Sequence, residues 1–207
     1  MGQRIPTGIR ISAVILAAGE SSRMGRDKAR VELDGRTLLS RAVATVRAAG
    51  IREVFISGRE VGSYTGLDCP VLHDAAPGCG PLAGIVEGLR AAGNPLVLVL
   101  AVDLPGMTGA FLRKLAARCN ARTGAVPELN GRLEPLAAIY PRRCQGLAEE
   151  LLQEGRRAAR AFAEACRRER AVGAFPVAPS DAACFENCNT PADLATALVR
   201  ARRGKRE

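Results

Sequence analysis

The sequence predicts one α/β domain with a mostly parallel central sheet and helices on both faces. Short apolar runs alternate along the chain with segments of helical periodicity, as in parallel strands that are joined by crossover helices. The run Leu96–Val102 is apolar throughout, which favours a central strand that is buried on both faces. The chain of 207 residues has the length of one domain, which we expect over residues 1–200 with a basic tail over 201–207.

The first half of the chain is expected to supply most of the sheet. Its first strand is Ser12–Ala17, and a helix follows over Thr37–Ala49, where apolar side chains recur on one stripe and Gly50 is placed to end the helix. Further strands are predicted over Glu53–Ser57, Cys69–Leu72 and Leu96–Val102, and a second helix is predicted over Pro81–Ala92.

The second half is richer in helices. The last helix has a clear start, because Thr190 suits the N-cap, Pro191 suits the first helical position, and Asp193 follows three residues after the cap. The other predictions are helices over Gly109–Arg122, Arg143–Gln153 and Arg157–Arg170, strands over Gly124–Pro127 and Val172–Pro176, an apolar stretch at Leu133–Tyr140, and an extended segment at Cys184–Asn187.

The net charge of +9 favours anionic ligands. Thirty Lys and Arg stand against 21 Asp and Glu, and all but three of the cations are arginine. Only 3% of the residues are aromatic and Trp is absent, so the chain has few residues from which the stacking platform of a single-strand nucleic-acid binder could be built. A positive field attracts polyphosphates and other small anions. Charge alone does not choose among these partners, and the small number of aromatic residues disfavours nucleic acid.

The cysteines indicate a reducing environment. Seven cysteines are an odd number, no CxxC pair is present, and the nearest two are Cys184 and Cys188, so neither a zinc site nor a disulfide framework is specified. Reduced, mostly buried thiols are typical of cytosolic proteins. The run Ile11–Ala18 continues directly into a glycine-rich loop and is interpreted as a strand, not an export signal. No segment approaches the ~20 apolar residues of a membrane span. The expected location is the cytoplasm, without membrane attachment.

A glycine-containing loop follows the first strand. Its turn, Ala17-Ala18-Gly19, consists of small residues that let backbone N–H groups approach phosphate oxygens, and Arg23 and Lys28 farther along can neutralise a triphosphate. Ligands of open α/β sheets bind outside the carboxyl ends of the strands, where this loop would lie. The spacing matches neither a Walker A loop nor GxGxxG. The simpler interpretation is a glycine turn with exposed charges.

Two carboxylates follow predicted strands. Asp103 comes at the end of the buried strand, where it can hold Mg²⁺ together with phosphate oxygens of a substrate, or merely cap the turn at Pro105. Asp74 precedes a loop and a helix that begins near Pro81, and the free N–H groups of that helix suit a polar or anionic ligand edge. His73 is the only histidine of the chain and is not expected to act as a catalytic base.

Three segments together resemble the molybdenum cofactor guanylyltransferase family. Val14–Lys28 is similar to the nucleotidyltransferase signature LAAG/LAGG-x-S-x-R-M-G-x-D-K, Gly80–Gly84 (GPLAG) to the family's base-recognition loop, and Asn187–Pro191 to its late Asn-x-Asn-Thr-Pro element. The resemblance implies a three-layer Rossmann-like nucleotidyltransferase fold. It also implies transfer of GMP from GTP to molybdopterin-bound molybdenum cofactor, with Mg²⁺ as the metal and pyrophosphate as the second product.

The resemblance assigns roles to individual residues. It implies that Arg23, Lys28 and Asp103 are catalytic, that Asp103 is the magnesium ligand, and that Asn187 and Asn189 contact the acceptor. The nucleotide-binding residues that it implies are Leu16, Ala17, Ala18, Gly19, Arg23, Lys28, Ser57, Asp74, Gly80, Pro81, Leu82 and Asp103.

One departure from the family pattern keeps a second nucleotide open. Residues 16–19 read Leu-Ala-Ala-Gly, as is usual for the molybdopterin cytidylyltransferase branch, whereas the guanylyl branch usually reads Leu-Ala-Gly-Gly. The GPLAG and Asn-x-Asn-Thr-Pro elements favour GTP, and CTP is the alternative. A sugar- or polyol-phosphate nucleotidyltransferase and a non-catalytic nucleotide-binding adaptor for molybdoenzyme maturation are further alternatives. The expected protein partners are molybdenum-insertion proteins and molybdoenzyme chaperones.

Overall fold

A mixed sheet runs through the centre of the protein. The computed structural model describes residues 5–6, 8–17, 28–58, 64, 66–73, 80–188 and 193. In this part of the chain the strand order is β5-β4-β1-β6-β9-β7-β10, with β8 paired to β7. Neighbouring strands from β5 to β6 are parallel, as are β7 and β10, whereas β9 is antiparallel to β6 and β7. The predicted mostly parallel α/β fold is therefore confirmed.

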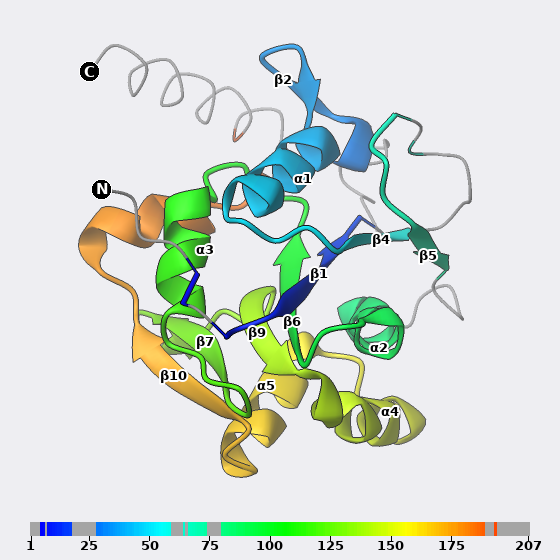
Figure 1. The fold of residues 1–207 in the computed structure, drawn as a ribbon, viewed down its shortest axis with the longest axis vertical. Coiled ribbons are helices and arrows are strands. Elements are labelled where there is room, and N and C mark those ends of the chain that lie inside the picture. Colours follow the sequence, from blue (N-terminus) through cyan, green and yellow to red (C-terminus); the bar gives the residue numbers. More distant parts are fainter. Residues whose placement is uncertain are drawn as a thin grey trace.

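The elements follow one another in the alternating order that the sequence predicts (Figure 1). The strands are β1 Ile11–Leu16, β2 Glu32–Leu33, β3 Arg36–Thr37, β4 Val54–Gly58, β5 Val71–His73, β6 Leu96–Ala101, β7 Gly124–Leu129, β8 Arg132–Leu133, β9 Ala137–Pro141 and β10 Val172–Pro176. The α-helices are α1 Leu38–Ala48, α2 Gly80–Ala91, α3 Gly109–Ala116, α4 Gln145–Gln153 and α5 Ala159–Arg168, and the 3₁₀ helices are η1 Lys28–Arg30, η2 Arg142–Cys144 and η3 Pro179–Phe185.

The sheet separates two apolar layers. Because successive side chains of a strand point to opposite faces, Ile15 of β1 packs in the layer that contains α1 and α3, and Val14 packs in the layer that contains α2, α4 and α5. Figure 1 shows the same division of the helices between the two faces. All six residues of β6 are buried, which confirms the prediction of a central strand covered on both sides.

Helix α3 is shorter than predicted. It ends at Ala116 rather than at Arg122, because the backbone turns away where Cys119 N–H donates to Ala116 O (3.1 Å). The side chain of Asn120 then accepts hydrogen bonds from the backbone N–H groups of Arg122 (2.9 Å) and Thr123 (2.8 Å). An Asn side chain that bonds nearby backbone in this way competes with the helix.

The predicted extended segment at Cys184–Asn187 is wrong in its first half. Cys184 and Phe185 belong to η3, and both side chains are buried. Phe185 packs edge-on against Phe111 of α3, with ring centroids 5.1 Å apart. This packing holds the segment against the apolar layer, where it forms a 3₁₀ helix.

Two short hairpins were missing from the sequence-based prediction. β2 and β3 are joined by Asp34 (φ 52°) and Gly35 (φ 69°), and β7 and β8 are joined by Asn130 (φ 51°) and Gly131 (φ 74°). Asp-Gly and Asn-Gly are the residue pairs that two-residue hairpin turns with positive φ favour. The signal for both hairpins was therefore present in the sequence.

The structure tests little of the predicted last helix. Of that helix only Asp193 belongs to the described residues, where it is helical. Within the described ranges, no helix combines the length and the apolar character that a membrane crossing needs.

Candidate active site

The strand order reverses between β1 and β6. From β1 the chain proceeds to β4 and β5 on one side of the sheet, and then returns to place β6 on the other side of β1. The two strands stay together at their carboxyl ends, where Val102 N–H donates to Leu16 O (3.2 Å). A reversal of this kind opens a crevice beyond the strand ends, which is the usual ligand site of open α/β sheets.

Lys28 and Asp103 meet at this reversal. Lys28 Nζ lies 3.2 Å from Asp103 Oδ2, and the two side chains are 16% and 23% exposed, respectively. Asp103 follows the end of β6, and Lys28 begins η1, whose next residue, Ala29, is buried in the core. The structure therefore brings together two of the residues to which the family resemblance assigned catalysis. A partly exposed cation and carboxylate at one strand edge suit a substrate phosphate and a hard metal ion, respectively.

The end of β1 can contribute backbone atoms, rather than side chains, to the site. Leu16 and Ala17 are buried, and Ala17 N–H donates to the backbone O of Ser57 at the end of β4 (2.8 Å). The Ser57 side chain is also buried, at 1% exposure, and it lies beneath α2. A Cβ on Gly84 of α2 would collide with Ser57 Oγ and would lie 2.8 Å from a methyl group of Leu16. Absence of a side chain at Gly84 thus lets α2 pack directly on the ends of β1 and β4.

The beginning of α2 lies at the same sheet edge. Gly80 has a φ of +68°, and a Cβ there would lie 3.1 Å from the backbone O of Arg157, so glycine fits this position far better than other residues. Gly80 is exposed and Pro81 is half-buried, whereas Leu82 has no exposed surface. Of the three predicted nucleotide-binding positions in this helix, the first two are therefore accessible, and Leu82 is a core residue.

A late segment of the chain docks on Asp103. Cys188 N–H donates to the backbone O of Asp103 (2.9 Å). Burial raises the pKa of the Cys188 thiol, the carboxylates of Asp193 and Asp103 raise it further, and Lys28 lowers it. Cys188 therefore lies within electrostatic reach of all three charged groups. Asn187, which the family resemblance assigned to acceptor binding, is exposed directly beside this contact.

Contacts upstream hold this late segment in place. Lys114 of α3 donates to both carboxylate oxygens of Asp181 in η3, at 3.0 and 2.9 Å. η3 approaches Gly106 so closely that a Cβ there would collide with the backbone O of Ala183. Sequence reasoning missed Asp193 and Cys188 as site residues, because Asp193 was interpreted only as part of a helix cap. The signal was their place beside Asn187 in the late Asn-x-Asn-Thr-Pro element.

The comparisons with known proteins show which family the chain belongs to. Residues 13–172 match the MobA-like NTP transferase domain family. The chain belongs to the MobA-like NTP transferases. It is 37% identical to a probable molybdenum cofactor guanylyltransferase of Opitutus terrae over 186 residues, which cover 88% of this chain and 92% of that protein. It is 36% identical to a protein of the same description from Mycobacterium ulcerans over 200 residues, which cover 94% and 96%.

A solved structure shares the fold of this MobA-like NTP transferase. The crystal structure of molybdopterin-guanine dinucleotide biosynthesis protein A from Archaeoglobus fulgidus superimposes with a TM-score of 0.74 at 23% sequence identity, and the match covers 93% of this chain and 99% of that one. The predicted family and its nucleotidyltransferase fold are therefore confirmed.

Part of the predicted site of this MobA-like NTP transferase lies outside the described residues. These positions are Ala18, Gly19, Arg23, Asp74 and Asn189. Among the described residues, no group of three or more His, Cys, Asp or Glu side chains is arranged to hold a metal ion. A carboxylate such as Asp103 fits Mg²⁺ when the substrate phosphates and water supply the remaining ligands.

Proposed function

We propose that this protein is a molybdenum cofactor guanylyltransferase, which transfers GMP from GTP to the molybdenum cofactor and releases pyrophosphate. The observation that carries the proposal is the Lys28–Asp103 pair at the reversal of strand order, in a chain whose relatives are named for this activity. The charge of +9 agrees with two anionic substrates.

The reaction needs little covalent chemistry from the protein. The terminal phosphate oxygen of the acceptor attacks the α-phosphorus of GTP, and the bond from that phosphorus to the bridging oxygen of pyrophosphate breaks. Positioning of the two substrates and neutralisation of their charges supply most of the rate of such a transfer. We assign Lys28 and Arg23 to the triphosphate, where they stabilise the α-phosphate and the departing pyrophosphate. The backbone from Leu16 to Gly19 then cradles the phosphates.

Asp103 is the residue that would hold Mg²⁺. When bound, the ion neutralises phosphate charge at the reacting centre. Asp103 can keep its place without substrate because two contacts fix it: its carboxylate pairs with Lys28, and its backbone O accepts the hydrogen bond from Cys188. Lys28 can exchange the carboxylate for a phosphate when nucleotide arrives.

The accessible start of α2 is assigned to the base. Gly80 and Pro81 lie at the site edge, and they belong with Ala18 and Asp74 to the segments that we assign to guanine recognition. Asn187 and Asn189 are assigned to the pterin-bearing acceptor. We expect the enzyme to work in the cytoplasm, where molybdenum-insertion proteins and molybdoenzyme chaperones would supply the acceptor and receive the product.

The choice between GTP and CTP is tested by calorimetry. Leu-Ala-Ala-Gly at residues 16–19 favours CTP, whereas the names of the relatives favour GTP. Isothermal titration with each nucleotide in Mg²⁺ buffer is expected to give a smaller dissociation constant for GTP. Tighter binding of CTP would overturn the choice of guanine and indicate a cytidylyltransferase.

A further inference from the structure

A charged hollow, here called the second hollow, lies at the end of the sheet opposite the nucleotide site. It has a volume of about 570 Å³, and Pro95 and Pro141 are among its lining residues. Pro95 precedes β6, and Pro141 ends β9, where it pairs with Leu96. Because β6 rises about 3.3 Å per residue, its six residues separate the hollow from Asp103 by roughly 20 Å. The hollow is therefore distinct from the nucleotide site.

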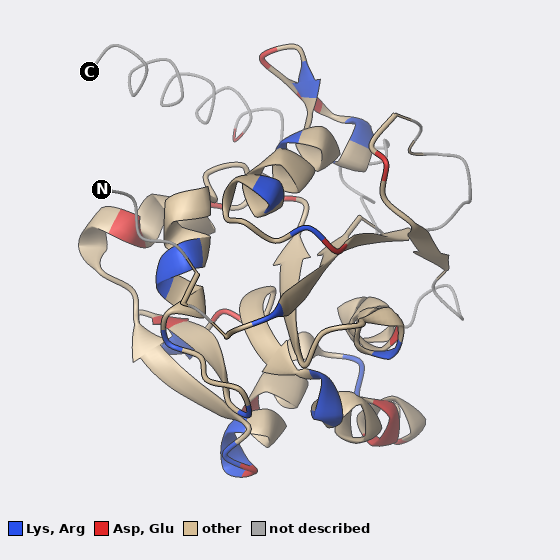
Figure 2. Cartoon of the chain, viewed as in Figure 1, with Lys and Arg blue, Asp and Glu red and all other residues tan. Residues whose placement is uncertain are grey.

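Three arginines line the hollow. Arg122, Arg142 and Arg143 all contribute to its wall, and all three residues are exposed. Within the part of the chain that the structure describes, none of their guanidinium groups forms an ion pair. Figure 2 shows lysine and arginine spread over many elements, so net charge alone does not distinguish this edge. Three arginines around one concave surface do distinguish it.

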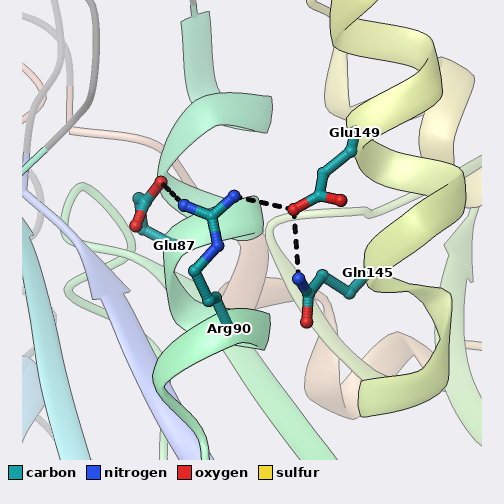
Figure 3. A network of polar contacts seen from close by, with 4 residues as sticks. All are labelled: Glu87, Arg90, Gln145 and Glu149. Atoms are coloured by element: carbon teal, nitrogen blue, oxygen red, sulfur yellow. Dashed lines mark hydrogen bonds and ion pairs between the residues drawn. The ribbon is translucent and has the colours of Figure 1, made fainter.

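The acidic side chain of the hollow is already engaged. Glu149 accepts a hydrogen bond from Gln145 (3.0 Å) and pairs with Arg90 (2.7 Å), and these contacts lower the pKa of Glu149, the Gln145 bond most. Arg90 also pairs with Glu87 (2.7 Å), so one guanidinium joins a carboxylate of α2 to one of α4 (Figure 3). Among the side chains that line the hollow, three arginines thus stand against one carboxylate, that of Glu149, which Arg90 already neutralises. The wall of the hollow is therefore positive.

The backbone that carries the three arginines is held in place. Arg122 belongs to the turn that Asn120 closes, and Arg142 N–H donates to Pro95 O (2.8 Å). The guanidinium of Arg143 donates to the backbone O of Arg122 (3.3 Å), which links the two segments across the hollow. A site whose backbone is fixed before the ligand arrives has less ordering entropy to lose on binding.

We propose that this hollow binds a small anion through its phosphate groups. Guanidinium groups present a planar fork that matches phosphate oxygens, and pockets of 300–1,000 Å³ are typical of small-molecule ligands. Free pyrophosphate and the phosphate of a nucleotide share this chemistry. Pro95, Ala121 and Pro141 line the same hollow and offer apolar surface that a nucleotide base could contact.

The test compares two variants that lose the same charge. The first is Arg122→Gln/Arg142→Gln/Arg143→Gln, and the matched control is Arg36→Gln/Arg160→Gln/Arg168→Gln, whose arginines are exposed on β3 and α5. Both carry Lys28→Ala, so that phosphate binding at the nucleotide site is reduced in each. Pyrophosphate, GMP and an octaglutamate peptide are titrated separately in EDTA, and backbone hydrogen exchange is followed by mass spectrometry.

We expect pyrophosphate to bind the first variant at least about tenfold more weakly than the Lys28→Ala parent, and the control variant to change less than about threefold. Exchange should slow in the parent over residues 120–123 and 142–146. Binding of GMP in addition to pyrophosphate would identify a nucleotide as the source of the phosphate, and binding of pyrophosphate alone would identify the free anion. Equal weakening in both variants, no slowing in these segments, or preference for octaglutamate over both phosphates would overturn the proposal.

Discussion

Lys28 Nζ and Asp103 Oδ2 lie 3.2 Å apart across the carboxyl ends of β1 and β6, although 75 positions separate the two residues in the sequence. The pair holds each charge in place before substrate binds. In the proposed reaction the two residues bind different groups, because a cation is suited to the triphosphate and a carboxylate is suited to Mg²⁺. Loss of the Lys28 side chain should therefore lower the rate of transfer, whereas loss of the Asp103 charge should also change the Mg²⁺ dependence of that rate.

Lys28→Ala should abolish most of the transfer. We expect kcat/KM to fall by about 100-fold or more, because loss of one preorganised charge-stabilising group costs this much in comparable sites. Far-UV circular dichroism should be unchanged, since the Lys28 side chain is partly exposed. Arg160→Ala is the control, because Arg160 also pairs with a carboxylate, that of Glu164, but on the exposed face of α5. Wild-type turnover in Lys28→Ala would contradict the assignment.

Asp103→Asn should change the response to Mg²⁺. The amide keeps the shape of the side chain but loses the charge that attracts a divalent ion. We expect a drop of at least about 100-fold in kcat and a higher Mg²⁺ concentration at half-maximal rate. The wild-type enzyme should lose its activity in excess EDTA and regain it when Mg²⁺ is restored. An unchanged Mg²⁺ titration in the variant would remove Asp103 from the metal site.

Gly106→Ala tests how the late segment reaches the site. The new methyl group would collide with the backbone O of Ala183, so η3 must move. We expect a loss of about 1–3 kcal/mol in the free energy of unfolding, as is typical of overpacking. Transfer should also weaken, because Cys188 and Asn187 follow η3 in the chain. Gly173→Ala, whose methyl group would meet nothing within 4 Å, is the control for urea unfolding and should change stability by less than about 0.5 kcal/mol.

The raised pKa of the Cys119 thiol predicts that the folded state loses stability at alkaline pH. Burial raises the pKa of Cys119 from 9.0 to about 12. Between these two values the unfolded chain loses the thiol proton and the folded chain keeps it, so the folded state loses stability as pH rises from 9 towards 12. One such proton contributes at most about 1.4 kcal/mol per pH unit. Urea unfolding from pH 8 to pH 10.5 should show a smaller decline for Cys119→Ala than for the wild type. Equal slopes would show that Cys119 does not contribute.

The sequence predicted strand bounds well where apolar residues form a short run between clear breaks. β10 has the predicted bounds of Val172–Pro176, and β1 and β6 differ from prediction by one residue at their ends. These strands are runs of apolar residues between clear breaks, so a short window of sequence suffices. α3 was too long in the prediction because the Asn120 turn interrupts an otherwise helical composition.

The site was predictable only in part. Composition and spacing placed Lys28 and Asp103 near the same sheet edge, and the family resemblance supplied their roles. The approach of Cys188 to Asp103 depends on η3 docking beside Gly106, a tertiary contact that no local pattern encodes, and Asp193 acts on Cys188 from the helix that follows. The three arginines of the second hollow come from the turn after α3 and from η2, so only the fold shows that they share one surface.

The most direct test of the proposed function is the transfer reaction itself. Purified protein, Mg²⁺, GTP and molybdenum cofactor are incubated together, and both pyrophosphate and the guanylylated cofactor are measured over time. We expect the two products to form in equal amounts, and neither to form when the cofactor is left out. A faster reaction with CTP, transfer to a sugar phosphate instead of the cofactor, or nucleotide binding without pyrophosphate release would contradict a guanylyltransferase built around Lys28 and Asp103.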